Sequence, residues 1–316
     1  MSLPLVIINP TSAGGATADA WPKIASELRT HFGPFQPAFT TKPAEGIEIA
    51  AEAARKGTKL IIACGGDGTI SEVANGILAS GCDAELGILP SGTGGDFRRT
   101  IDIPNRAGAA AVILRDGQTR SIDVGRASYT TGSVEQETRY FVGIASFGMS
   151  ADVIARVKAG QPQWLPAKAP RWLTSRFSFG SAMLQSAARM KPTRVLIQLD
   201  DKSAQRTTVA NLCVANAKYF GGGMKIAPDA KLTDGKFDVV SIGDLSLSRI
   251  LANAPLLYFG AHLSLPEVQH ALAAKITASP IDKDQRIQLE LDGELPGFLP
   301  ATFQIVPRAL RIRCPR

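Results

Sequence analysis

The stretch "GGDGT", residues 65–69, combines three glycines and one carboxylate between an apolar run and a segment of helical character. Glycines let backbone N–H groups approach an anion closely, and the start of a helix adds a favourable dipole. This spacing is typical of a phosphate-binding loop. Asp67 is unusual beside phosphate, and a carboxylate there makes sense if it serves Mg²⁺ or a hydroxyl group. The alternative is a tight turn with Asp67 as the N-cap of the next helix.

Two more loops of small residues follow apolar strands, "NPTSAGG" (9–15) and "PSGTGGDF" (90–97). Their polar members are Asn9, Thr11, Ser12, Thr93 and Asp96. Ligands of parallel α/β sheets bind at the carboxyl ends of the strands, so the three loops are expected to converge on one crevice. None of them is a Walker A loop or a G-x-G-x-x-G fingerprint.

The elements that would hold these loops alternate in the first third of the chain. Expected strands are 5–9, 35–41, 59–64 and 85–90, and expected helices are 17–31, 44–56 and 69–80. Continuous apolar strands between helices predict a parallel sheet that is covered on both faces.

From about residue 120 the pattern changes to strands separated by turn residues. Expected strands are 139–146, 194–199, 207–216, 237–243, 286–291 and 302–306, with helices near 171–190 and 246–258. We predict α/β plus β: an α/β domain with a parallel sheet over 1–122 and a mainly antiparallel β domain over 123–307. The return of a C-terminal segment, 308–316, to the first domain is left open.

The amino-acid composition limits the functions that the protein can have. The 316 residues carry a net charge of +7, which suits anionic partners such as nucleotides, phosphate or anionic membranes. The four scattered cysteines and the three histidines form no metal-ligand spacing, and the cysteines are expected to be buried free thiols in a reducing cytoplasm. No apolar run is long enough to span a bilayer, and the N-terminus is not expected to be a signal peptide.

Residues 153–199 contain no Asp or Glu but many Lys and Arg, with Trp164, Trp172, Phe177 and Phe179 among them. A basic, aromatic surface would let a soluble enzyme visit anionic lipid headgroups. The alternative is a helix pair that buries its aromatic residues beneath a solvated basic face. We expect no nucleic-acid partner, because no known nucleic-acid motif is present.

The motifs resemble, in their order along the chain, those of the diacylglycerol kinase catalytic-domain family, closest to the bacterial soluble lipid kinases. They are "NPTSAGG", "GGDGT", "LPSGTGGDFRR", "YFGGGMKIAPDAKLTDGKFDVV" and "LDGE", and the resemblance spans nearly the whole chain. "GGDGT" alone would also fit NAD kinases. The resemblance implies an α/β domain and a β-sandwich-like domain with the active site between them. The implied chemistry is transfer of the γ-phosphate of ATP, with Mg²⁺, to a lipid hydroxyl.

Carried over to this sequence, the resemblance places the nucleotide phosphates on Gly65, Gly66, Asp67, Gly68, Thr69, Ile70 and Ser71. Further implied nucleotide contacts are Asn9, Thr11, Thr41 (or its neighbour Thr40), Thr93 and Asp96. The implied catalytic carboxylates are Asp292 and Glu294 of "LDGE", and we favour Asp292 as base and Glu294 as linked to magnesium. The implied magnesium loop contains Lys231, Asp234 and Lys236. From the residues alone, "LDGE" reads as a type I turn, and 231–238 is also compatible with a plain hairpin turn.

One position departs from the family, which commonly has Asn where this chain has Gly95. Glycine removes an amide from the third loop, so a nucleotide-binding regulatory protein without catalysis remains an alternative to an enzyme. The leading hypothesis is a kinase that converts diacylglycerol to phosphatidic acid. A kinase of another hydroxylated lipid, such as a sphingoid base or a glycolipid, is the other alternative.

We expect a cytoplasmic protein, peripheral at the inner membrane surface, that makes transient contact with anionic lipid. Acyl-chain preference and the choice between monomer and homodimer stay open.

Overall fold

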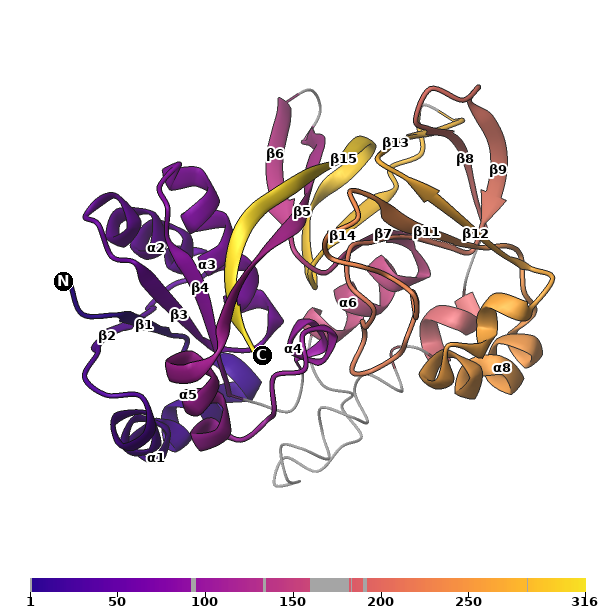
Figure 1. Ribbon diagram of the computed structural model, residues 1–316. Coiled ribbons are helices and arrows are strands. Elements are labelled where there is room, and N and C mark those ends of the chain that lie inside the picture. Colours follow the sequence, from indigo (N-terminus) through magenta and orange to yellow (C-terminus); the bar gives the residue numbers. More distant parts are fainter. Residues whose placement is uncertain are drawn as a thin grey trace.

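The computed structural model of the protein describes residues 2–91, 95–132, 135–159, 182, 184–189, 192–282 and 284–316. An α/β domain and a β domain lie side by side, and two long curved strands run between them (Figure 1). The expected fold class is confirmed.

The α/β domain is built on four parallel strands in the order β4-β3-β1-β2. They are β1 Leu5–Ile8, β2 Gln36–Phe39, β3 Leu60–Gly65 and β4 Glu85–Pro90. Its helices are α1 Ala16–His31, α2 Glu45–Arg55, α3 Asp67–Ser80, α4 Asp96–Thr100 and α5 Ala107–Asp116, and a 3-10 turn, η1, spans Ser12–Gly15. Every residue of β3 is buried, which is expected of a sheet covered on both faces.

The β domain contains mainly antiparallel strands. They are β5 Gln118–Thr131, β6 Glu135–Phe141, β7 Ile144–Gly148, β8 Thr193–Leu199, β9 Gln205–Val209, β10 Asn211–Ala215, β11 Phe237–Ile242, β12 Val268–Ala273, β13 Lys275–Pro280, β14 Gln288–Leu291 and β15 Glu294–Cys314. Its helical segments include α6 Met149–Ala159, α8 Leu247–Phe259 and η2 Ala261–Ser264, and residues 184–189 are also helical. Its core includes Phe141, Phe147, Phe237 and Phe303, all fully buried.

Two expected strands are each divided in the structure. The run 139–146 was expected to be continuous, but β6 ends at Phe141 and β7 begins at Ile144. The run 207–216 is interrupted at Ala210, between β9 and β10. Hydrophobicity alone does not reveal such breaks, because the intervening residues Val142 and Ala210 are themselves apolar and buried.

Strands β5 and β15 connect the two domains. Along most of its length β15 pairs antiparallel with β5, and near its end Arg311 and Ile312 pair in parallel with β4. Arg311 and Arg313 also bind the carboxylate of Glu85 on β4, at 2.7 and 2.6 Å. The boundaries 1–122, 123–307 and 308–316 stay a prediction.

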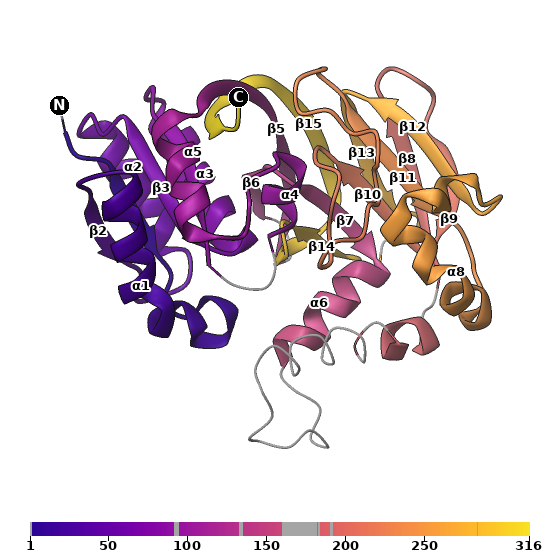
Figure 2. The same ribbon diagram turned by 60° about the horizontal axis from the view of Figure 1, so that its bottom comes forward.

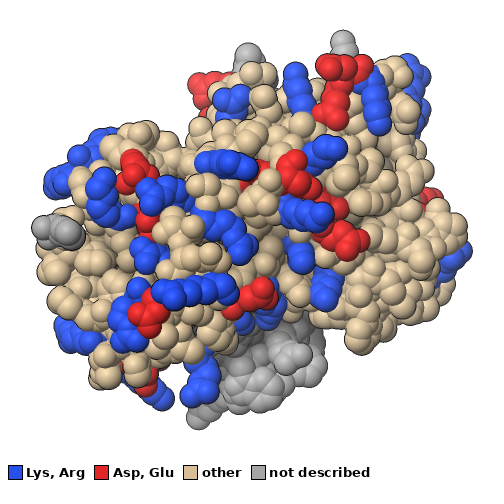
Figure 3. All heavy atoms as spheres, viewed as in Figure 1, with Lys and Arg blue, Asp and Glu red and all other residues tan. Residues whose placement is uncertain are grey.

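Charged side chains are spread over both domains on the face shown in Figure 3, where Lys and Arg are interspersed with Asp and Glu. Helices α6 and α8 lie along one edge of the β domain (Figure 2). Residues 160–181 lie outside the described part of the chain, and the expected aromatic surface falls there. Among the described residues, no helix combines the length and the apolar character needed to cross a bilayer.

Candidate active site

The loops that follow β1, β3 and β4 touch one another. The hydroxyls of Ser12 and Thr69 lie 3.3 Å apart, and the N–H of Ser91 donates to the carbonyl of Gly65 at 3.2 Å. A Cβ atom at Gly65 would lie 2.3 Å from Oγ1 of Thr69 and 3.0 Å from Oγ of Ser12, so only glycine fits there. The three loops are thus packed into one surface at the carboxyl edge of the sheet.

Asp67 organises the third loop rather than capping its own helix. Its carboxylate accepts hydrogen bonds from the N–H groups of Gly95, Asp96 and Phe97, at 3.1, 3.0 and 3.0 Å. It therefore satisfies the first N–H groups of α4, which have no partner within that helix. The interpretation of Asp67 as N-cap of its own helix is therefore wrong, because Gly66 takes that position, while its role toward Mg²⁺ or a nucleotide stays a prediction. Thr93, expected in the same loop, lies outside the described residues.

The first turn of α3 presents backbone donors toward the loops. Gly66 is the N-cap, and the first hydrogen bond of the helix runs from the N–H of Ile70 to the carbonyl of Gly66 at 3.1 Å. The N–H groups of Asp67, Gly68 and Thr69 precede that bond, as at every helix start, and can face an anion. The side chain of Ile70 is buried in the core, so it offers a ligand only its backbone.

The other residues expected at the nucleotide make local contacts. Asn9 accepts from the N–H and the hydroxyl of Thr11, at 3.0 and 2.7 Å, which shapes the first loop. The N–H of Thr41 donates to the carboxylate of Glu45 at 2.5 Å and its hydroxyl donates at 3.0 Å, and these bonds hold the pKa of Glu45 below its usual value. Thr40 is buried and bonds to β1. These contacts position the loops and leave the nucleotide roles of Asn9, Thr11 and Thr41 as predictions.

The "LDGE" segment is a two-residue hairpin between β14 and β15, because Leu291 pairs with Glu294. Asp292 and Gly293 have φ of 47° and 85°. Positive φ at both central residues is what a type I′ turn requires, so the expected type I turn is corrected. The tighter, primed turn is what lets adjacent antiparallel strands keep their twist.

Asp292 is held by the break between β6 and β7. Its carboxylate accepts hydrogen bonds from the N–H groups of Val142, Gly143 and Ile144, at 2.9, 2.8 and 3.1 Å. Burial raises the pKa of Asp292 to about 6, and these backbone bonds oppose the rise. A Cβ at Gly143 would lie 2.8 Å from this carboxylate, so glycine is needed for the contact.

Helix α3 also contacts this junction directly. The hydroxyl of Ser71 bonds to Asp292. One turn later, Asn75 donates to the carbonyl of Tyr140 and accepts from its N–H, both at 2.9 Å. Helix α3, which begins at the glycine loop 65–69, is therefore bonded both to β6 and to the hairpin that carries Asp292 and Glu294.

Glu294 is the carboxylate that faces the loop of the first domain. Its Oε1 lies 3.7 Å from the position that a Cβ on Gly68 would take. Its side chain is 44% exposed and forms an ion pair with Lys158 of α6 at 2.5 Å. Asp292 is only partly buried but already accepts three backbone bonds, whereas the carboxylate of Glu294 is held by the ion pair with Lys158. The choice of Asp292 as base stays a prediction, and this geometry makes Glu294 the alternative.

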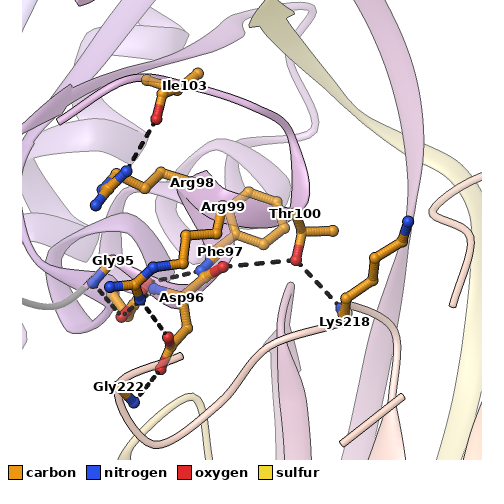
Figure 4. A network of polar contacts seen from close by, with 10 residues as sticks. Gly95, Asp96, Phe97, Arg98, Arg99, Thr100, Ile103, Lys218 and Gly222 are labelled. Atoms are coloured by element: carbon orange, nitrogen blue, oxygen red, sulfur yellow. Dashed lines mark hydrogen bonds and ion pairs between the residues drawn. The ribbon is translucent and has the colours of Figure 1, made fainter. Parts of the chain in front are cut away.

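Helix α4 bonds to the second domain through Asp96 at its start and Thr100 at its end (Figure 4). Asp96 pairs with Arg99 at 2.6 Å and accepts from the N–H of Gly222 at 2.8 Å. The N–H of Lys218 donates to the hydroxyl of Thr100 at 3.2 Å. Burial raises the pKa of Asp96, and the nearby carboxylate of Asp67 adds to the rise. Asp96 is thus a link between the domains.

The expected magnesium loop is a turn braced by buried Asp123. One carboxylate oxygen of Asp123 accepts from the N–H of Gly235 at 2.7 Å, while Asp234 accepts from Lys236 at 3.1 Å and is exposed. No cluster of three or more His, Cys, Asp or Glu suited to a metal occurs within the described ranges. A cation here would depend on one carboxylate and backbone carbonyls, including that of Lys231, and such oxygen donors fit Mg²⁺.

Sequence reasoning missed three buried polar residues that hold the site together: Asp123, Asn75 and Glu290. Glu290 accepts from Ser146 and from the N–H of Gly293 at 2.5 Å, and burial raises its pKa to about 7. Asp123 and Glu290 were visible as lone acids between aliphatic residues of a strand, "SIDVG" and "QLELD". Asn75 interrupts the apolar face of a helix. Each pattern indicates a buried polar group that needs partners.

The α/β domain with its glycine loops, facing a carboxylate hairpin of a β domain, defines a two-domain phosphotransferase. Residues 4–127 match the diacylglycerol kinase catalytic domain, and residues 144–314 match the YegS C-terminal NAD kinase beta sandwich-like domain. The chain belongs to the diacylglycerol kinase catalytic-domain family and is a kinase, as the motifs predicted.

Individual relatives agree over most of their length. The chain is 32% identical to the diacylglycerol kinase of Bacillus subtilis, over 88% of this chain and 84% of the relative. It is also 32% identical to a Mycobacterium tuberculosis diacylglycerol kinase, over 85% and 81%. A crystal structure of a diacylglycerol kinase from Bacillus anthracis shares the fold, with a TM-score of 0.70, 19% identity and coverage of 99% and 96%.

Proposed function

We propose that the protein transfers the γ-phosphate of ATP to a lipid hydroxyl, with diacylglycerol as the first candidate acceptor and phosphatidic acid as product. The observation that carries the proposal is the position of Glu294, a half-exposed carboxylate from the second domain beside Gly68 of the glycine loop. Phosphoryl transfer needs donors for the phosphates and a group that orients the attacking hydroxyl, and these two parts meet there. The names of the relatives support the choice of acceptor.

In this proposal each group at the site has a separate role in phosphoryl transfer. Backbone N–H groups at the start of α3 hold the nucleotide phosphates, and Glu294 accepts the proton of the lipid hydroxyl. Lys158 fixes the orientation of Glu294, and Asp292 fixes the hairpin that presents it. Mg²⁺ would neutralise phosphate charge in the reaction, and Asp234 with the carbonyls of Lys231 and Lys236 is the proposed site of a second, structural ion.

We propose that the enzyme works at the surface of an anionic membrane from the cytoplasm. The support is the net charge of +7 and the acid-free stretch 153–199, together with an acceptor that resides in membranes. Within this stretch, Lys158 lies at the candidate site itself, and Arg156 precedes it on α6.

The test is transfer of γ-labelled phosphate from Mg-ATP to detergent-dispersed lipids: diacylglycerol, monoacylglycerol, sphingosine and ceramide. We expect label on diacylglycerol and a loss of about 10²- to 10⁴-fold in kcat for Glu294→Gln. Glu48→Gln on α2, whose side chain is 74% exposed, is the matched control and keeps the wild-type rate.

Three outcomes count against the proposal. A full rate in Glu294→Gln would remove Glu294 as the base. Label confined to sphingosine or ceramide would replace diacylglycerol with another hydroxylated lipid. Measurable ATP binding without label on any lipid would favour the non-catalytic regulatory protein.

A further inference from the structure

The glycine at position 95 makes room for a specific neighbour. Gly95 has φ of 95°, and a Cβ there would lie 2.7 Å from Nε, 2.9 Å from Cδ and 3.0 Å from Cγ of Arg98. Asn adopts positive φ more readily than other non-glycine residues, so the backbone alone does not demand glycine. The side chain of Arg98 does: a side chain at 95 and Arg98 in its present position exclude each other.

Arg98 is a cation without an ion-pair partner in the part of the chain that the structure describes. Its Nη1 donates to the carbonyl of Ile103 at 3.1 Å, while its buried Nε has no partner there. The two nearest carboxylates are committed elsewhere, since Asp67 accepts three backbone bonds and Asp96 binds Arg99. Figure 4 shows Arg98 directed to Ile103 and Arg99 directed to Asp96. Burying part of a guanidinium without a counter-ion costs free energy, and a bound anion would offset this cost.

Arg98 lies beside the glycine-containing loops that follow β3 and β4. It lines a cavity of about 10 Å³ together with Gly65, Gly66, Ser91, Gly95 and Asn105. Such a space admits about one water molecule, so Arg98 stands at the edge of the loop surface rather than over a deep pocket. Guanidinium groups bind phosphate oxygens through two parallel hydrogen bonds, which a lysine cannot reproduce.

We propose that Arg98 is a nucleotide-binding residue whose guanidinium contacts the phosphate groups of ATP, and that Gly95 serves to admit it. The inference rests on the proposed function, because it takes ATP as the phosphate donor. In this proposal the positive charge beside the third loop comes from Arg98, which was not among the nucleotide contacts expected from the sequence. The proposal also explains why this chain has Gly95 where the family commonly has Asn. The hydrogen-bond donor is the guanidinium of Arg98 instead of an amide at position 95.

The experiment measures binding of Mg-ATP and of adenosine by calorimetry, without any lipid. Arg98→Ala is expected to raise the Kd for Mg-ATP by about 10- to 100-fold, the effect of losing hydrogen bonds to a charged group. Arg98→Lys is expected to recover only part of this loss. Binding of adenosine, which carries no phosphate, stays unchanged. Arg115→Ala, which removes an exposed arginine of α5, is the matched control.

Gly95→Asn tests the pairing of the two positions. Alone it displaces Arg98 and weakens Mg-ATP binding, whereas the double variant Gly95→Asn/Arg98→Ala is expected to bind no worse than either single variant. Losses that multiply in the double variant would overturn the pairing. Thermal unfolding of each variant reports whether the fold is intact.

Other outcomes would contradict the role of Arg98. A Kd for Mg-ATP within twofold of wild type in Arg98→Ala would overturn this inference and leave the proposed function unaffected. Equal losses for ATP and adenosine would do the same, because they would show that Arg98 only supports the loop at Ile103. Wild-type protein that binds no Mg-ATP would overturn the proposed donor and this inference together.

Discussion

The glycine loop at 65–71 and the hairpin at 291–294 face each other but are built on opposite plans. The loop offers backbone N–H groups, and its side chains are small, buried or used to hold neighbouring loops. The hairpin offers side-chain carboxylates on a turn with two residues of positive φ. In the proposed reaction, donors for an anion come from the backbone of one domain, and the proton acceptor comes from a side chain of the other.

The comparison also shows how carboxylates are accommodated beside a phosphate site. Asp67 and Asp292 each accept three backbone N–H bonds, so their charge is compensated and they act as braces. Glu294 is compensated instead by one ion pair, with the ammonium of the half-exposed Lys158 side chain. This difference in partners is the basis on which we propose Glu294, rather than Asp67 or Asp292, as the reacting carboxylate.

The largest effect is expected where the loop depends on the absence of a side chain. Gly65→Ala forces a methyl group to within 2.3 Å of Thr69 Oγ1, and we expect it to lower the free energy of unfolding by about 3 kcal/mol and to abolish Mg-ATP binding. Gly66→Ala is the matched control, because a Cβ there meets no atom within 4 Å and the backbone is extended. Urea unfolding and calorimetry measure both effects.

Equal behaviour of the two alanine variants would contradict the view that the loop is set by contact between Gly65 and Thr69. Loss of ATP binding in Gly66→Ala alone, with the fold intact, would move the critical backbone approach from the strand end to the helix start.

Next in size is the contrast between the two carboxylates of the hairpin. Asp292→Asn places an amide NH₂ among the N–H groups of 142–144, and we expect it to cost about 1–3 kcal/mol of unfolding free energy. Glu294→Gln removes only a surface ion pair and is expected to change stability by less than about 1 kcal/mol, while it removes activity. A stable Asp292→Asn protein without activity would return the base to Asp292.

The smallest effect concerns the pH dependence of stability. Burial raises the pKa of Glu290 from 4.5 to about 7, so between these values the folded state holds a proton that the unfolded state has lost. The stabilisation is complete below pH 4.5 and is lost as pH rises through about 7. Glu290→Gln should therefore flatten this decline, by on the order of 2 kcal/mol between pH 4.5 and 8.

The measurement is urea unfolding across this pH range, with Glu48→Gln, an exposed residue, as control. The comparison is between wild type and variant, because Asp292, with a pKa of about 6, contributes to the decline in both. Parallel curves for wild type and Glu290→Gln would show that Glu290 is ionised at similar pH in both states.

What the sequence could reveal was the backbone plan of the α/β domain. Hydrophobic runs located β1, β3 and β4, and the glycines that follow them located the loops, because both features depend on neighbours along the chain. The fold class and the family followed from the same motifs.

What the sequence could not reveal was the direction of individual side chains. Asp67 turns to α4 and Asp292 to the break after β6, and both choices depend on segments far away in the chain. The position of Ile70 in a binding motif did not show that its side chain belongs to the core. Arg98 gave no sign of its role, because the space above Gly95 exists only in three dimensions.

The parallel pairing of β15 with β4 has a consequence for how the protein is made. Arg311 lies 226 positions after its partner Glu85, so a nascent chain carries β4 as an open sheet edge through most of its synthesis. The α/β domain cannot complete its sheet as an independent unit, although it comes first. We expect its early intermediates to need protection from edge-to-edge association until those downstream residues emerge from the ribosome.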